Sequence, residues 1–203
     1  MLDLGVHGLI APATSPRPTG GPITIAGLLD PLLAEDPARL VLVGRSGHFS
    51  VEALDDATTR AAHALRALGV SPGDRVAAAL PNDVAIIVAF LAAMKVGAIW
   101  VGMNRPLAGP EKAYMLADSQ TALFLGDPEM IEQVGAHRGD LPDLRRLVVV
   151  APGTDADEWD ALLEVAPSTP VGVATDPLAP AAIAYTSGTT GFPKGAVHTQ
   201  HNL

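Results

Sequence analysis

Short apolar runs that are continuous rather than alternating recur along the chain, and this pattern strongly limits its fold. The runs lie at 75–80, 98–103, 121–125, 146–150 and 181–185. A strand with one face in water alternates apolar and polar residues, whereas a strand covered on both faces is apolar throughout. Between several of these runs, apolar residues recur with helical spacing. The sequence therefore predicts an α/β fold in which mainly parallel sheets are covered by helices.

Three helices are predicted with defined ends. The first follows the capping residue Ser50, carries apolar residues every three or four positions, and ends at Gly69. The second begins after Asp83 and ends near Gly97. The third spans 109–118 and has a proline in its first turn.

Composition excludes several classes of function. The chain has 203 residues, of which 48% are hydrophobic and 17% charged, as in globular proteins. Its net charge of −9 argues against a nucleic-acid partner, which requires a broad basic surface. The absence of cysteine excludes disulfides, thiolate metal sites and thiol nucleophiles, and it fits a reducing compartment. We therefore expect a cytoplasmic protein.

The apolar stretch 84–103 could be mistaken for a membrane span. Lys95 would then lie in mid-span, at a cost of about 2.5–3.5 kcal/mol, and Gly97 interrupts the stretch. We interpret it as a buried helix followed by a buried strand, and we predict no transmembrane segment. The N-terminus lacks the basic region of a signal peptide.

Residues 185–195, with the sequence YTSGTTGFPKG, contain the main functional signal. Small hydroxyl residues and glycines allow a tight bend that turns several N–H groups toward one point, and the lysine adds a full positive charge. Such a loop can bind polyphosphate, although it is not the Walker motif. A flexible linker is the alternative, but the apolar flanks and the Pro-Lys-Gly ending argue against it. The candidate phosphate-binding residues are Thr186, Ser187, Gly188, Thr189, Thr190, Gly191 and Lys194.

This segment resembles the AMP-binding signature of the adenylate-forming enzymes, which include acyl-CoA synthetases, luciferases and peptide-synthetase adenylation domains. The likeness extends through 47–107, where the Gly-Asp-Arg-Val turn, the Pro-Asn helix start and the Gly-Ala junction occur in the family's order. We therefore divide the chain into a Pro/Gly-rich lead-in, 1–22, and the N-terminal portion of an AMP-binding domain, 23–203.

The resemblance implies a role for each part of the loop. Residues 186–191 would wrap the β- and γ-phosphates of ATP, and Thr186 would help to bind Mg²⁺. Lys194 would act as the catalytic residue that neutralises the departing pyrophosphate. The implied reaction activates a carboxylic acid, with a fatty acid as the leading expectation, as an acyl-adenylate and then transfers the acyl group to coenzyme A.

Family members carry further motifs downstream, including an adenine-binding segment, a magnesium-binding glutamate and a ribose-binding aspartate. None has a counterpart here, so we expect an N-terminal fragment that lacks the C-terminal part of the same enzyme and is inactive alone. Two alternatives stay open. The chain could belong to an amino-acid adenylation domain, or it could be a non-catalytic nucleotide-binding or interaction fragment.

Several other residues are interpreted as structural. His198 and His201 are expected at a strand edge or a helix cap, and Asp118 at a helix end. Trp100 and Met103 are expected in the core rather than in a substrate pocket. The acidic residues of 155–160 are interpreted as a solvated face rather than a metal site.

Overall fold

The computed structural model describes residues 24–173, 175–186 and 192–203. Two short 3-10 helices, Ile25–Gly27 and Arg138–Asp140, accompany the main elements. The α-helices are α1 (Asp30–Glu35), α2 (Val51–Ala67), α3 (Val84–Lys95), α4 (Gly109–Asp118), α5 (Pro128–Gly135) and α6 (Glu158–Val165). The strands are β1 (Leu40–Gly44), β2 (Gly47–Ser50), β3 (Arg75–Ala79), β4 (Ile99–Gly102), β5 (Thr121–Gly126), β6 (Arg146–Val149), β7 (Pro180–Thr186) and β8 (Lys194–Thr199).

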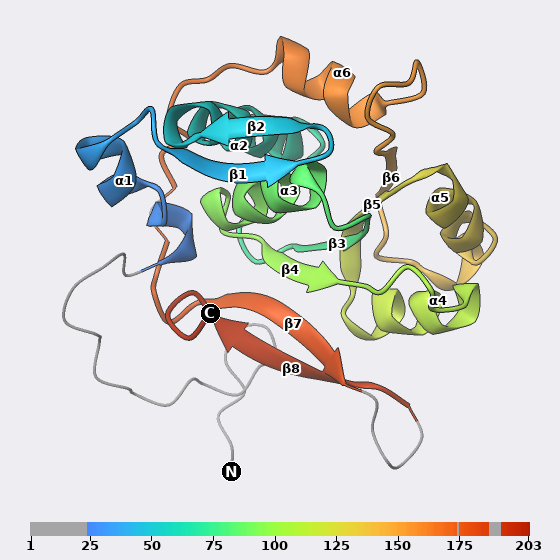
Figure 1. The fold of residues 1–203 in the computed structure, drawn as a ribbon. Helices are drawn as coiled ribbons and strands as arrows, with labels where there is room; N and C mark the ends of the chain where they lie inside the picture. The colour runs from blue at the N-terminus through green and yellow to red at the C-terminus, as the bar shows by residue number, and fades with distance from the viewer. Residues whose placement is uncertain (1–23, 174, 187–191) are drawn as a thin grey trace.

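The main sheet has the strand order β6-β5-β3-β4-β7-β8 (Figure 1). Every neighbouring pair from β6 to β7 is parallel, whereas β8 returns antiparallel to β7 as the second strand of a hairpin. A second, two-stranded sheet is formed by the β1–β2 hairpin and packs near α2 and α3. The mainly parallel α/β fold predicted from the apolar runs is thus confirmed.

Both faces of the main sheet are covered along β3, β4 and β5, which explains why these three strands are almost entirely apolar. Along β3, Val76 and Ala78 pack in one hydrophobic cluster with residues of α2 and α3. Ala77 and Ala79 point the other way, into a second cluster with residues of α4 and α5. All four side chains are fully buried. Successive residues of a strand face opposite sides, so two cores require a continuous apolar run.

Local capping confirms the helix starts predicted from the sequence. The Ser50 hydroxyl accepts a hydrogen bond from the Ala53 amide at the start of α2. The Asp83 carboxylate caps α3 by accepting from the Val84 amide, and it also accepts from the Arg45 amide of the β1–β2 turn. These backbone hydrogen bonds lower the pKa of Asp83, led by the bond from Val84. The cap of α3 therefore also ties down the small sheet.

The prediction that the acidic residues of 155–160 form only a solvated face is incomplete. Asp157 is nearly buried and caps α6, where its carboxylate accepts a hydrogen bond from the Asp160 amide. Trp159, in the first turn of this helix, is only 3% exposed and anchors α6 on the core of α2 and α3. The segment therefore starts a helix, with a capping carboxylate and a buried aromatic side chain in the first turn. The number of acidic residues in the sequence does not by itself indicate such a start.

Lys95 lies inside the apolar stretch that could be mistaken for a membrane span. Its ammonium donates to the Asp55 carboxylate at 2.6 Å and to the Thr59 hydroxyl at 2.8 Å, both on α2. Across 24–173, 175–186 and 192–203, no helix combines the length and the apolar character needed to cross a bilayer.

The outer edge of β8 leads to our first prediction. Within the described residues no strand pairs with this edge, and Val197, which lies in β8, is 38% exposed. An open edge with apolar side chains invites pairing with another chain. Residues 1–203 alone are therefore expected to self-associate, as measured by size-exclusion chromatography with light scattering.

A matched pair of substitutions checks this expectation. Val197→Lys places a charge on the edge and should increase the monomer fraction. Val165→Lys adds the same charge at an 83% exposed position on α6, away from the edge, and should leave association unchanged. A chain that stays monomeric at all concentrations would contradict the prediction.

Candidate active site

The sheet topology opens a crevice at the carboxyl ends of β3 and β4. The chain leaves β3 for α3, which packs on one face of the sheet, and leaves β4 for α4, which packs on the other. Two neighbouring strands whose connections depart to opposite faces leave a gap between those connections, where α/β proteins commonly bind ligands. Here the gap lies between residues 80–83 and 103–108.

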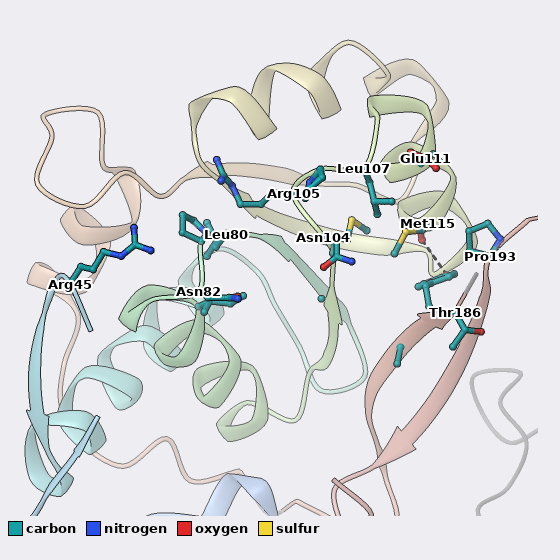
Figure 2. Close-up of a pocket in the computed structure, with 17 residues that line it drawn as sticks. Arg45, Leu80, Asn82, Asn104, Arg105, Leu107, Glu111, Met115, Thr186 and Pro193 are labelled. Atoms are coloured by element: carbon teal, nitrogen blue, oxygen red, sulfur yellow. Dashed lines mark hydrogen bonds between the residues drawn. The ribbon is translucent and has the colours of Figure 1, made fainter. Parts of the chain in front are cut away.

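A cavity of about 960 Å³ occupies this position (Figure 2). Figure 2 shows Thr186 and Pro193, from the β7–β8 hairpin, on one side of it, and Arg45 and Asn82 on the opposite side. The segment after β4 lines it through Met103, Asn104, Arg105, Pro106 and Leu107. Apolar side chains therefore alternate with amide, hydroxyl and guanidinium groups around a space large enough for a small-molecule substrate.

The β7–β8 hairpin holds the two ends of the predicted phosphate loop together. Thr186, the last residue of β7, is the cross-strand partner of Lys194, the first residue of β8. Both are exposed, and Thr186 lines the cavity. The remaining candidates, Ser187, Gly188, Thr189, Thr190 and Gly191, lie outside the described residues. The structure thus pairs a residue that carries a cation, Lys194, with a hydroxyl residue that lines the cavity, Thr186.

Lys194 differs from the other lysines of the chain in its freedom to meet a ligand. Lys95 is paired with Asp55, and Lys112 is completely buried, whereas Lys194 is exposed. No ion pair between described residues involves Lys194, so among them it can neutralise an anion without first breaking such a pair.

Lys112 supports the segment that lines the cavity after β4. Its ammonium donates to the carbonyl of Arg105 at 2.8 Å, to the carbonyl of Leu107, and to Gln133 Oε1 at 2.9 Å. Burial lowers the pKa of Lys112, and the nearby carboxylate of Glu129 partly opposes this shift. All three N–H donors are used, so a buried cation fixes the backbone of this lining segment.

Arg105 is held in the same region by a second interaction. Its guanidinium pairs with the carboxylate of Asp127, which also caps α5. The ion pair links the cavity lining to the start of α5 and restrains a charged group that lines the cavity.

Tyr185 connects β7 to the C-terminal end of α4. Its hydroxyl donates to the Asp118 carboxylate at 2.6 Å. Burial raises the pKa of Tyr185, and the hydrogen bond to Asp118 raises it further, so the phenol stays protonated. The expected helix-end position of Asp118 is confirmed, but sequence reasoning missed its contact with the hairpin because the two residues are far apart in the chain.

The structural interpretation of Trp100 is confirmed and that of Met103 is incomplete. Trp100 packs in the core, edge-on to Phe90. Met103 is 6% exposed and belongs to the second core cluster, yet it also lines the cavity. His198 lies within the edge strand β8, as expected.

Comparison with known proteins identifies the family. Residues 32–203 match the family described as AMP-binding enzyme. The chain belongs to this family. The β7–β8 hairpin and the cavity beside it are therefore parts of an AMP-binding domain.

Similar proteins are acid–CoA ligases. The chain is 36% identical over 150 residues to a long-chain-fatty-acid–CoA ligase, FadD13, of Mycobacterium tuberculosis, covering 71% of this chain and 28% of that protein. It is 40% identical over 144 residues to a feruloyl-CoA synthase of Amycolatopsis, covering 71% of this chain and 27% of that protein. A fatty acyl-CoA synthetase structure from M. tuberculosis superposes with a TM-score of 0.79 at 27% identity, covering 88% of this chain and 35% of that one.

These comparisons also show which portion of the AMP-binding fold is present. The chain spans between a quarter and a third of the length of the curated relatives named above. The matched portion, 32–203, includes the cavity and the β7–β8 hairpin.

Proposed function

We propose that this chain supplies the phosphate-binding part of an enzyme that activates a carboxylic acid with ATP and joins it to coenzyme A. The observation that carries the proposal is the pairing of Thr186 with Lys194 across the β7–β8 hairpin, beside a cavity at the carboxyl ends of the strands. Membership of the AMP-binding family supports it. The segments that bind adenine, ribose and the thiol would come from outside residues 1–203.

In the first step, a carboxylate oxygen attacks the α-phosphorus of ATP and the bond to pyrophosphate breaks, which leaves an acyl-adenylate. Two anions must approach each other, so positioning and charge stabilisation carry the catalysis. We assign this work to Lys194, to Thr186 and to the loop residues Ser187, Gly188, Thr189, Thr190 and Gly191. In the second step, a thiol attacks the acyl carbon and AMP leaves.

Thr186 is the residue that we propose to hold Mg²⁺. It is exposed at the end of β7 and lines the cavity, and a hydroxyl oxygen suits this hard cation. Mg²⁺ usually keeps several waters and binds substrate phosphates, so one protein ligand fits such a site. When bound, the ion would neutralise charge on the phosphates of ATP.

The acid is proposed to be a fatty acid, and a panel of acids tests this choice. The purified protein that carries this chain is assayed for exchange of labelled pyrophosphate into ATP, with fatty acids, aromatic acids and amino acids supplied separately. Fatty-acid-dependent exchange, followed by CoA thioester formation, is the expected result. Exchange that depends on an amino acid and proceeds without coenzyme A would favour an amino-acid adenylation domain. ATP binding without pyrophosphate exchange would favour a non-catalytic role. A cytoplasmic location stays a prediction.

A further inference from the structure

Helix α4 contacts both described ends of the phosphate-loop hairpin. At the end of β7, the Tyr185 hydroxyl donates to the Asp118 carboxylate at 2.6 Å. On the side of β8, the Tyr114 hydroxyl donates to the Pro193 carbonyl at 3.2 Å. Tyr114 and Asp118 are one helical turn apart, so they lie on the same face of α4. One helix face thus reaches the chain on either side of the loop.

An aromatic stack reinforces the contact on the side of β8. The rings of Tyr114 and Phe192 lie 5.0 Å apart between centroids, with an interplanar angle of 27°. Phe192 is 73% exposed, so it is not held by burial in the core. Stacked pairs at this separation attract each other beyond the area that they bury. The stack and the Tyr114 hydrogen bond therefore restrain the two residues that directly precede Lys194.

The other neighbour of Lys194 is restrained by Tyr185. Gly195 is the cross-strand partner of Tyr185. A Cβ atom at Gly195 would lie 3.3 Å from the Tyr185 ring and 2.6 Å from Ile183 Cγ2, so a glycine is needed for β8 to approach β7 this closely. Lys194 therefore lies between residues that are both held, directly or through Tyr185, by α4.

We infer that α4 positions the two described ends of the candidate phosphate loop, and that Tyr114, with Asp118, is a positioning residue for Lys194 and Thr186. This inference rests on the proposed function. A lysine binds a pyrophosphate group more tightly when its position is fixed before the ligand arrives. The entropy cost of ordering the side chain is then not subtracted from the binding free energy. The contacts of α4 supply this order although neither Tyr114 nor Asp118 lines the cavity.

The alternative is that Tyr114 only stabilises the fold, since it packs against the second core cluster. The two roles predict different measurements. A positioning role changes the KM for ATP in the exchange reaction and the affinity for Mg·ATP in calorimetry. A purely structural role changes the melting temperature and leaves both of these constants as they are.

The test uses three variants of the protein that carries this chain. Tyr114→Phe keeps the stack and loses one hydrogen bond, so the KM for ATP should rise about fivefold with little change in melting temperature. Tyr114→Ala loses the stack as well, and the KM should rise about 30-fold. Phe192→Ala should raise it about fivefold, and combining it with Tyr114→Ala should add nothing further, because both remove the same stack.

A control variant separates loss of stability from loss of position. Leu65→Ala removes fully buried packing from α2, which packs on the opposite face of the main sheet from α4. It should lower the melting temperature and leave the KM for ATP unchanged.

The possible outcomes distinguish this inference from the proposed function. A wild-type protein that neither exchanges pyrophosphate nor binds ATP would overturn both. A wild-type protein that exchanges, with Tyr114 variants that lose melting temperature but keep the wild-type KM, would overturn the positioning role alone. A raised KM in Tyr114→Phe at an unchanged melting temperature is the result that supports it.

Discussion

Replacing Lys194 with alanine is expected to slow adenylate formation about 100-fold, the usual loss when one charge-stabilising donor is removed from a transition state. Lys194 is exposed and begins an edge strand, so the melting temperature should not change. The measurement is single-turnover formation of acyl-adenylate at saturating ATP and acid, with thermal unfolding followed in parallel.

Two further variants control for charge and shape. Lys194→Arg keeps the positive charge and should recover part of the rate, although a planar guanidinium does not match a point charge. Arg39→Ala removes one exposed positive charge at a position outside the cavity, and the rate should stay at the wild-type level. Near-normal turnover of Lys194→Ala, accompanied by a lowered melting temperature, would show that this lysine serves packing instead of phosphate binding.

Replacing Lys112 with methionine is expected to lower the free energy of unfolding by about 3 kcal/mol, because three acceptors would each lose a partner at roughly 1–3 kcal/mol and methionine keeps most of the volume. The acceptors are the carbonyls of Arg105 and Leu107 and the side chain of Gln133. Chemical denaturation measures the change. Gln133→Ala, which removes only one of these acceptors, should cost about 1 kcal/mol.

The pH dependence of the free energy of unfolding provides a second check on the role of Lys112. Burial lowers its pKa in the folded state below the ordinary value of 10.5, so the folded protein releases this proton before the unfolded chain does. Stability increases with pH wherever the unfolded state binds more protons. The free energy of unfolding of the wild type should therefore rise relative to that of Lys112→Met as the pH approaches 10.5 from below. A variant as stable as the wild type at every pH would mean that the lining carbonyls find other partners.

The apolar runs were sufficient to predict the central strands β3, β4 and β5, because each of them is buried on both faces and its composition reflects that burial directly. The exposed edge strand β8 is not one of these runs. Caps such as Ser50 and Asp83 could also be predicted, since a helix start is a local arrangement. The short helices α1 and α6 were not predicted. Their starts fall in proline-containing or acidic segments whose local signals resemble loops.

The candidate site was predicted in part, for a similar reason. The composition of 185–195 indicated a phosphate loop, and the residues at its two described ends, Thr186 and Lys194, are cross-strand partners, of which Thr186 lines the cavity. The supporting residues Tyr114, Asp118 and Lys112 carried no such signal. Their roles depend on which strand neighbours β4 and where α4 packs, and these contacts join residues far apart in the chain.

The position of β7 in the sheet has a consequence for how the molecule assembles. β7 pairs with β4, yet two strands, β5 and β6, are made between them and pair on the far side of β3. Contacts between distant segments form slowly, because the intervening chain must first be closed into a loop. During synthesis on the ribosome, β3, β4 and α4 can therefore fold against one another before the β7–β8 hairpin has been synthesised. The hairpin then docks onto a surface made before it, so among the described residues the β7–β8 side of the cavity is completed after the side formed by the segments that follow β3 and β4.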